Sequence, residues 1–176
     1  MRKAKMLKSI SLAAVLLTAC ANPMMGSQYG AQFQSAADPQ ISGKAMLERH
    51  NADLRLKIMV AGLKPGARHG FHLHETGDCS ASDFSSAGAH FNPNQKDHGH
   101  QSTKTHLGDM SNLIADAQGQ AMAEFKIDDL SLDPAAANSV IGRAVVIHAD
   151  ADDYKTQPAG NSGARIACGV ISEMKQ

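Results

Sequence analysis

HGFHLHETGDC (residues 69–79) is the stretch that decides the fold of this chain. Within it, His72 and His74 alternate with Phe71 and Leu73. On a β-strand, residues i and i+2 share a face, so both imidazoles point one way and the apolar pair points the other. A helical zinc motif would need histidines four apart with an adjacent glutamate, and the sequence has none. The stretch therefore predicts a strand that presents two imidazoles.

More histidines follow in segments rich in Gly, Asn, Asp and Ser, a composition typical of loops. These segments are GAHFNPNQKDHGH (88–100), THLGDM (105–110) and VVIHADADDY (145–154). Imidazole is the commonest protein ligand for zinc and copper, and a metal site gathers its ligands from separate segments. We therefore expect a metal centre built from one strand and a long loop that folds over it.

The rest of the chain after residue 40 has the alternation typical of strands. Leucine, isoleucine and valine at 54, 56, 58 and 60 alternate with Arg55, Lys57 and Met59, and 41–48 precedes them across a turn at Asn51, which predicts a hairpin. A second hairpin is predicted for 113–117 and 120–127, on either side of Gln118-Gly119. Further strands are expected within 140–148 and 164–171.

Short strands, turn-rich connections and the lack of a long amphipathic pattern predict an all-β fold, an antiparallel β-sandwich or barrel. Two long segments interrupt the strand pattern, at about 76–106 and 149–163. Loops of this length are usually functional. We expect them to carry the metal ligands and the approach to the metal.

The first twenty residues have the pattern of an export signal. Basic residues at 2, 3, 5 and 8 precede a short apolar segment at 9–17, which is too short to span a bilayer as a helix. Leu17-Thr18-Ala19-Cys20 then resembles a lipobox, in which Cys20 is lipidated, and Ala21 after it suggests outer-membrane sorting. An ordinary secretory signal with an incidental Cys20 is the alternative.

The signal divides the chain into three parts: the signal at 1–20, a flexible tether at 21–38, and one domain at 39–176. Removing the signal takes four of the 17 basic residues and none of the 17 acidic ones, which leaves a net charge of −4. Such a charge does not favour nucleic-acid binding. We expect membrane contact through the lipid anchor alone and a location in the periplasm.

Five motifs together resemble the copper/zinc superoxide dismutases, in order and in approximate spacing. They are GFHLHETGDC (70–79), GAHFNP (88–93), HLGDM (106–110), IHADADD (147–153) and GNSGARIACGVI (160–171). The resemblance covers roughly residues 39–176. It implies a Greek-key β-sandwich, one copper and one zinc per chain, and superoxide as the substrate, converted to oxygen and hydrogen peroxide.

The resemblance also implies the ligand sets. The copper ligands would be His72, His74, His90 and His148, and the zinc ligands would be His90, His98, His106 and Asp109. His90 would then bridge both ions and, in the reaction, release copper and take a proton. His98 has the family's spacing from His90, although His100 could replace it. His69 and His50 are expected to be ordinary histidines.

Three further roles follow from the resemblance. Asp152 would hydrogen-bond His72 and His98, and Arg165 would hold the anion beside copper. Cys79 would pair with Cys168, whereas the alternative is two buried free thiols.

Rival functions are a non-catalytic copper/zinc-binding or delivery protein on this fold, which would be expected to lack some ligands, and a zinc hydrolase, which needs an open zinc position. The resemblance allows either a monomer or a homodimer.

Overall fold

The computed structural model describes residues 28–36, 41–51, 53–103 and 105–175 of the chain. Within these residues it contains eleven strands and one short 3-10 turn over Ser85–Ala87. Each ladder between the strands is antiparallel. The predicted all-β, antiparallel class is therefore confirmed. No helix in the described residues is long and apolar enough to cross a membrane.

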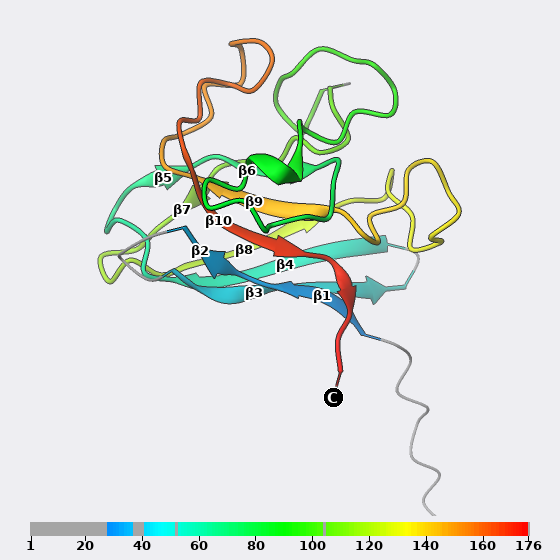
Figure 1. Ribbon diagram of the computed structural model, residues 1–176, viewed down its shortest axis with the longest axis horizontal. Helices are drawn as coiled ribbons and strands as arrows, with labels where there is room; N and C mark the ends of the chain where they lie inside the picture. The colour runs from blue at the N-terminus through cyan, green and yellow to red at the C-terminus, as the bar shows by residue number, and fades with distance from the viewer. Residues whose placement is uncertain (1–27, 37–40, 52, 104, 176) are drawn as a thin grey trace, which may run out of the picture.

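The strands form two facing sheets (Figure 1). The first has the order β11 (Ser172–Glu173), β1 (Tyr29–Gln32), β3 (Ser42–His50), β4 (Asp53–Ala61) and β8 (Ala121–Lys126). The second has the order β2 (Gln34–Ser35), β10 (Arg165–Val170), β9 (Ala144–His148) and β6 (Phe71–His74). A small separate pair joins β5 (Arg68–His69) to β7 (Leu113–Ile114).

The chain crosses repeatedly between the two sheets, in a Greek-key arrangement. It leaves the first sheet after β4 for β6, returns to it with β8, and crosses again to β9. At the N-terminal side, β1 belongs to the first sheet and β2 to the second, with buried Phe33 between them. A strand that switches sheets in this way makes a corner of the sandwich.

The first predicted hairpin is confirmed. β3 and β4 pair in the register Ala45↔Ile58 and Leu47↔Leu56, so that these apolar side chains share the inner face. Asn51 lies in the connecting turn with φ 57°, a backbone conformation that asparagine tolerates better than most residues.

The second predicted hairpin is wrong in its pairing. The turn is present, because the Asp116 N–H donates to the Gln120 carbonyl at 2.8 Å and Gly119 has φ 75°. However, β7 pairs with β5 through His69↔Leu113, and β8 pairs with β4. The chain changes sheets at this turn, so each arm finds a different partner.

The expectation of a flexible tether over residues 21–38 is wrong for residues 29–35, which form β1 and β2. Ala31 and Phe33 are buried, whereas Gln32 and Gln34 are exposed. This alternation spans too few residues to stand out in the sequence, and main-chain pairing with β3 supplies the missing stabilisation. Residues 1–27, which include Cys20, lie outside the described residues.

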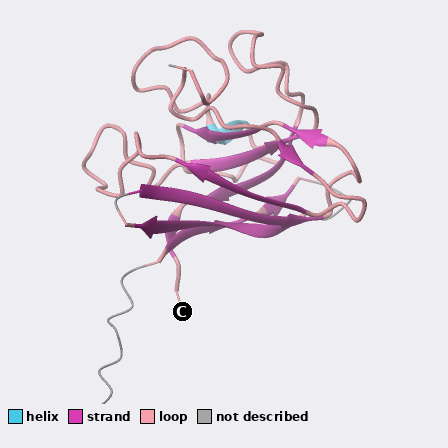
Figure 2. Cartoon of the chain, turned by 180° about the vertical axis from the view of Figure 1, so that it is seen from behind, coloured by secondary structure: helices cyan, strands magenta, loops and turns pink. Residues whose placement is uncertain are grey.

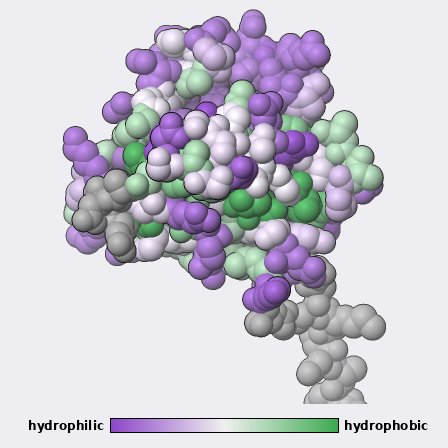
Figure 3. Space-filling model, in the orientation of Figure 1, coloured by the Kyte–Doolittle hydropathy of each residue, from purple (hydrophilic) through white to green (hydrophobic). Residues whose placement is uncertain are grey.

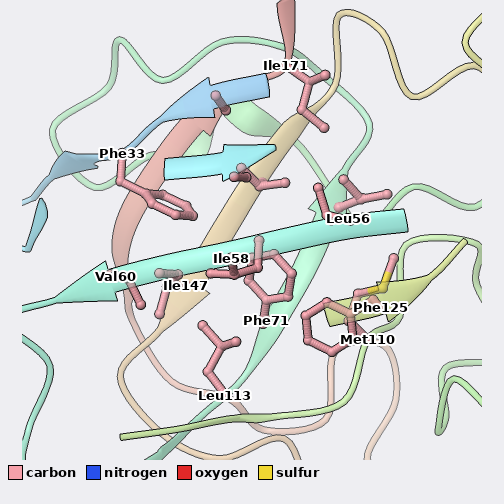
Figure 4. Close-up of a cluster of buried hydrophobic side chains, with 14 of the residues drawn as sticks. Phe33, Leu56, Ile58, Val60, Phe71, Met110, Leu113, Phe125, Ile147 and Ile171 are labelled. Carbon is pink, nitrogen blue, oxygen red and sulfur yellow. The ribbon is translucent and has the colours of Figure 1, made fainter. Parts of the chain in front are cut away.

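The core lies between the two sheets (Figure 4). Leu56 and Ile58 of β4 meet Phe71 of β6 and Ile147 of β9 there. The rings of Phe71 and Phe125 stack across the interior with their centroids 5.4 Å apart. Each fully buried side chain of this size stabilises the fold by ~1.5–3 kcal/mol. The core thus fixes β6 and β9, the strands that carry the metal-type histidines.

The two long loops leave the sandwich on the same side (Figures 1 and 2). Figure 1 shows one in green and the other in orange at the top of the view. Hydrophilic residues predominate on the loops in this orientation (Figure 3). The predicted long loops are therefore present, and both rise from the side of the second sheet that faces away from the core.

The predicted disulfide between Cys79 and Cys168 is confirmed. It joins the first long loop to β10, with 5.8 Å between the Cα atoms, across a sequence separation of 89. In the chain-entropy account, closing a loop of this length stabilises a fold by ~4–5 kcal/mol. Cys168 is fully buried, and Cys79 is nearly so, so that the loop is fastened at its base.

Candidate metal centre

β6 supplies two imidazoles, as its sequence predicts. Phe71 and Leu73 belong to the core, and His72 and His74 lie at alternate positions, yet all four residues are buried. The histidines are buried because the first long loop returns over them, with isolated bridges His72↔Asp109 and His74↔His90.

Main-chain hydrogen bonds hold this returning loop against β6. The Phe91 N–H donates to the Leu73 carbonyl at 2.8 Å, and the Leu73 N–H donates to the Gly108 carbonyl at 2.9 Å. A Cβ at Gly108 would collide with the Leu73 carbonyl oxygen, so only glycine allows this approach. The neighbouring His90 and Asp109 are thereby set beside the β6 histidines.

One cluster consists of four buried histidines whose ligand atoms all lie within 4.8 Å of one another: His72, His74, His90 and His148. His72 and His74 come from β6, His148 ends β9, and His90 comes from the loop. The strands β6 and β9 are neighbours in the second sheet, which explains why residues so far apart in sequence meet.

Each histidine of this cluster has one ring nitrogen bound by the protein and one without a hydrogen-bond partner. Nδ1 of His74 lies 2.9 Å from the Gly88 carbonyl, and Nδ1 of His148 lies 3.3 Å from the Gly163 carbonyl. The four nitrogens of this cluster without a partner among the described residues are Nδ1 of His72 and Nε2 of His74, His90 and His148. Leaving such groups unsatisfied is costly, so the set fits a metal ion held by imidazoles.

The protonation state of these rings also supports metal binding at the first cluster. Burial, followed by the influence of neighbouring His90, lowers the pKa of His74 well below its ordinary value. Burial likewise lowers the pKa of His72 to about 4 and that of His148 to about 3. At neutral pH these rings are neutral, which is the form that binds a metal.

A second cluster meets around one carboxylate oxygen. Oδ1 of Asp109 lies 3.0 Å from Nδ1 of His90, 2.9 Å from Nδ1 of His98 and 3.2 Å from Nδ1 of His106. Tetrahedral zinc with bonds of ~2.0–2.1 Å separates its ligand atoms by roughly 3.3 Å. Three nitrogens and one oxygen at these spacings fit a closed zinc site.

Charge in the second cluster differs from that in the first. Burial opposes ionisation of Asp109, but hydrogen bonds with His90 and His98 outweigh it and hold its pKa well below the usual range. Burial would lower the pKa of His98, yet its hydrogen bonds with Asp109 and Asp152 raise it to about 9. The second cluster therefore combines one anionic carboxylate with three imidazoles.

His90 belongs to both clusters. Its Nδ1 lies in the second cluster beside Asp109, whereas its Nε2 is one of the four unpartnered nitrogens of the first. The ring stacks on His72 with 3.9 Å between the centroids. One imidazole thus separates the two sets of ligand atoms and contributes a nitrogen to each.

Asp152 also connects the two clusters. Its Oδ2 lies 2.8 Å from Nε2 of His72, and its Oδ1 lies 3.0 Å from Nε2 of His98. Burial opposes the ionised form, but these two hydrogen bonds and the Tyr154 N–H keep the pKa of Asp152 low. The arrangement is the one that the sequence motif implies for Asp152.

A family model for copper/zinc superoxide dismutase matches residues 41–171. The chain belongs to this family. It is 42% identical over 136 residues to a copper/zinc superoxide dismutase of Aquifex aeolicus, covering 75% of this chain and 80% of that protein. It is 41% identical over 128 residues to a superoxide dismutase-like protein of Bacillus subtilis, covering 70% and 65% respectively.

A solved structure agrees with this membership. The crystal structure of a double mutant of a superoxide dismutase-like protein from Bacillus subtilis superposes with a TM-score of 0.72 at 38% sequence identity. The match covers 80% of this chain and 94% of the other. The family's two metals match the two clusters, which can hold copper and zinc.

In this copper/zinc superoxide dismutase fold, Arg165 lies beside the first cluster. It begins β10 and is paired in register with His148. The half-buried guanidinium donates to the Phe84 and Gly88 carbonyls, each at 2.6 Å. The Gly88 carbonyl also contacts Nδ1 of His74, so one backbone group orients both side chains.

The histidines outside the two clusters are His50, His69 and His100. His100 Nδ1 lies 2.8 Å from the Ser102 hydroxyl, and its ring meets that of Tyr154 edge-on. His98, not His100, therefore joins the second cluster. His69 is buried with Nδ1 2.8 Å from the His148 carbonyl, and His50 is exposed at the end of β3.

Three residues that sequence reasoning missed position the dismutase site. Asn112 makes two hydrogen bonds with the backbone of Asp152, at 2.8 and 3.0 Å. The Gln157 side chain accepts from the His98 N–H at 2.9 Å and donates to the His98 carbonyl at 3.0 Å. Gly160 lies so close to Asp152 that a Cβ would overlap its Oδ1. The partners of Asn112 and Gln157 are 40 and 59 residues away, so no local pattern indicates their roles.

Proposed function

We propose that this chain is an active copper/zinc superoxide dismutase that converts superoxide to oxygen and hydrogen peroxide. The observation that carries the proposal is that all four histidines of the first cluster hold one buried ring nitrogen without a hydrogen-bond partner, and that one of them, His90, is shared with the second cluster. A protein that had lost its metals would be expected to replace or pair such groups, because burying them unpaired is unfavourable.

The ligand assignment follows from the two clusters. Copper would be held by His72, His74, His90 and His148, and zinc by His90, His98, His106 and Asp109. Bound copper would supply one-electron redox chemistry, while zinc in a closed site would supply structure and charge. Asp152 would fix the tautomers of His72 and His98 and thereby aim their other nitrogens.

Two residues would act on the substrate and the proton. Arg165 has five N–H donors, and its hydrogen bonds to the Phe84 and Gly88 carbonyls leave other donors for a small anion. Its fixed positive charge would attract superoxide to the first cluster. His90 could accept a proton at Nε2, the nitrogen that faces the first cluster, and pass it toward the peroxide product.

The rival is a non-catalytic copper/zinc-binding or delivery protein on the same fold. A relative of comparable identity carries the name superoxide dismutase-like protein, so similarity by itself does not separate the two functions. The complete pair of clusters and the placement of Arg165 favour the enzyme.

Metal content and superoxide decay, measured on protein purified from its native compartment, test the proposal. We expect about one copper and one zinc per chain with rapid, copper-dependent decay. Zinc alone, or both metals without faster decay than the metal-free protein, would support the binding protein instead.

We also propose that the chain is exported to the periplasm and tethered to the outer membrane through a lipid on Cys20, as a monomer or a homodimer. The support is the basic and apolar pattern of residues 2–17 and the lipobox-like segment that ends at Cys20. A single acyl-type anchor tethers a protein by burying its chains in the bilayer.

Membrane fractionation with mass spectrometry tests the anchor. The unmutated chain should carry acyl groups and sediment with outer membranes, whereas Cys20→Ala should lack them. Asn22 lies two residues beyond Cys20, so that Asn22→Ser serves as a control and should stay lipidated. An acyl-free, unmutated protein in the soluble periplasmic fraction would contradict the anchor but not the enzyme.

A further inference from the structure

The outer face of the first sheet has an unusual composition. Polar and charged side chains occupy most outward positions of β3, β4 and β8, as expected for a face in contact with water. The large apolar residues at these positions are all methionines: Met46, Met59 and Met122. Met59 is 41% exposed and Met122 is 79% exposed.

The strand register brings these three thioethers together. Met59 and Met122 are direct partners across the β4–β8 ladder. Met46 is the partner of Lys57 across the β3–β4 ladder, which makes Met59 its diagonal neighbour. Direct partners have Cβ atoms ~4.5–5.5 Å apart and diagonal ones ~7–8 Å apart, within reach of long side chains.

A fourth methionine continues this band. Gly30 of β1 is the partner of Met46, and a Cβ at Gly30 would lie 2.6 Å from the sulfur of Met174. Four of the five methionines in the described residues therefore lie across one face, and the fifth, Met110, is in the core. Nothing in the packing of the sandwich requires sulfur at exposed positions.

Met46, Met59 and Met122 line one surface hollow of about 540 Å³. The charged side chains around it compensate one another: Lys57 lies 2.7 Å from Glu48 and 3.8 Å from Glu124. Methionine is common in protein interfaces, but the core of an interface is depleted in lysine and glutamate, and here both residue types stand between the methionines. The selective use of thioethers points to a ligand that prefers sulfur.

We propose that Met46, Met59 and Met122 form a surface site for Cu(I). Thioethers are soft donors that select Cu(I) over zinc and over the hard divalent ions. Three of them can surround a monovalent ion without adding negative charge, and the two lysines that line the hollow, Lys44 and Lys57, are balanced by Glu48 and Glu124.

This site is separate from the metal centre. The three methionines are on the outer face of the first sheet, whereas both histidine clusters lie at the second sheet and its loops, with the core in between. Binding at the hollow involves no ligand of either cluster. The site would hold copper outside the enzyme's own centre, whichever function that centre performs.

Silver titration of the full chain, loaded with copper and zinc, tests the proposal. Ag(I) is used first because it prefers the same soft ligands and does not change oxidation state. We expect about one additional equivalent to bind, and ¹³C-methyl resonances of Met46, Met59 and Met122 to shift while that of Met110 stays in place. Cu(I) under oxygen-free conditions should shift the same resonances.

Leucine substitutions locate the site, because leucine keeps the size and apolarity of methionine. Met59→Leu with Met122→Leu should weaken silver binding by about tenfold or more, with unchanged superoxide decay. Met174→Leu is the matched control on the same face and should bind silver normally.

Three results would overturn the proposal. One is unchanged silver binding in the triple variant of Met46, Met59 and Met122. Another is an equal loss in Met174→Leu. The third is a loss caused by leucine at Met24 and Met25 alone, which lie outside the described residues. If the unmutated chain does not accelerate superoxide decay, the proposed enzyme function is wrong, but the proposed Cu(I) site is not affected.

Discussion

Nε2 of His72 lies 2.8 Å from Oδ2 of Asp152, with both side chains fully buried. The carboxylate takes one nitrogen of the ring and thereby turns the other, Nδ1, toward the first histidine cluster. Because the second oxygen of Asp152 contacts His98, a single side chain orients one ligand in each cluster. Such outer carboxylates fix the tautomer and the direction of metal-binding histidines.

Asp152→Asn should weaken metal retention. An amide has one oxygen, so it can accept from only one of the two imidazoles, and the other loses its fixed orientation. We expect a loss of about 10–100-fold in metal affinity, measured by competition with a chelator, with superoxide decay falling in parallel. Asp153→Asn, at the exposed neighbouring position, is the control. Equal metal retention in the two variants would contradict this role.

Zinc binding to the metal-free protein should depend on pH up to about 9. Hydrogen bonds with Asp109 and Asp152 outweigh burial and raise the pKa of His98 to about 9, so a proton must leave before zinc binds. Zinc affinity should therefore rise by about tenfold per pH unit toward that value and then level off. Calorimetric titrations in buffers of different ionisation enthalpy would measure the released proton.

The same raised pKa has the opposite sign for the stability of the metal-free fold. Protonated His98 stabilises it fully below the ordinary value of 6.5, and this contribution is lost as the pH rises through about 9.

Asp152→Asn removes one carboxylate and should move the levelling of zinc affinity to lower pH. If zinc affinity does not change between pH 6.5 and 9, His98 is not protonated in the metal-free protein and this prediction is wrong.

Gly160→Ala should disturb the metal centre through Asp152. Gly160 has φ 67°, and a Cβ there would overlap Oδ1 of Asp152 and lie 2.6 Å from Nε2 of His98. Gly142 is a matched control, because it has φ 75° and no atom within 4 Å of its Cβ position. Both substitutions strain the backbone, but Gly160→Ala alone should release zinc faster to a chelator. Equal release rates would show that backbone strain, not contact with Asp152, matters.

His148→Ala and Asp109→Ala should separate the two metals. His148 belongs to the first cluster alone, so its loss should abolish copper binding and superoxide decay while zinc remains. Asp109 belongs to the second cluster alone, so its loss should chiefly reduce zinc binding and thermal stability, with some copper-dependent decay retained. Metal analysis of both variants measures this, and equal loss of both metals in each would contradict two separable sites.

Arg165→Ala should slow the reaction with superoxide and leave metal content unchanged. The chain without its first twenty residues has a net charge of −4, so attraction of an anion requires a local positive field. Fields of this kind raise association rates by ~10–10³-fold and weaken with salt. We expect a loss of about tenfold or more and a flatter dependence on ionic strength, measured by pulse radiolysis or stopped flow.

Substitutions that keep or reverse the charge sharpen this test. Arg165→Lys retains the charge but cannot donate to both the Phe84 and Gly88 carbonyls as the planar guanidinium does, so its rate should be intermediate. Arg165→Glu should be slower than Arg165→Ala. Full activity in Arg165→Glu would remove this residue from the mechanism.

The sequence by itself determined the fold class and most members of the candidate site. The period of two over residues 54–60 and in FHLH (71–74) indicates a face buried against a core, because the side chains of a strand alternate between its two faces. The five motifs include all but one of the cluster residues, and their resemblance to the family supplied that one, His98, from its spacing, together with the pairing of Cys79 with Cys168. These features are local or carried by motifs, so they can be seen without coordinates.

Tertiary structure alone decided which segments meet. β1 and β2 form because β3 and β10 offer edges for pairing, and β7 pairs with β5 because the chain changes sheets at Gly119. Asn112 and Gln157 act on partners 40 and 59 residues away, which no local pattern encodes. The spacing predicted His98 rather than His100, and the structure gives the physical reason: the carboxylates of Asp109 and Asp152 contact the His98 ring, whereas His100 contacts Ser102.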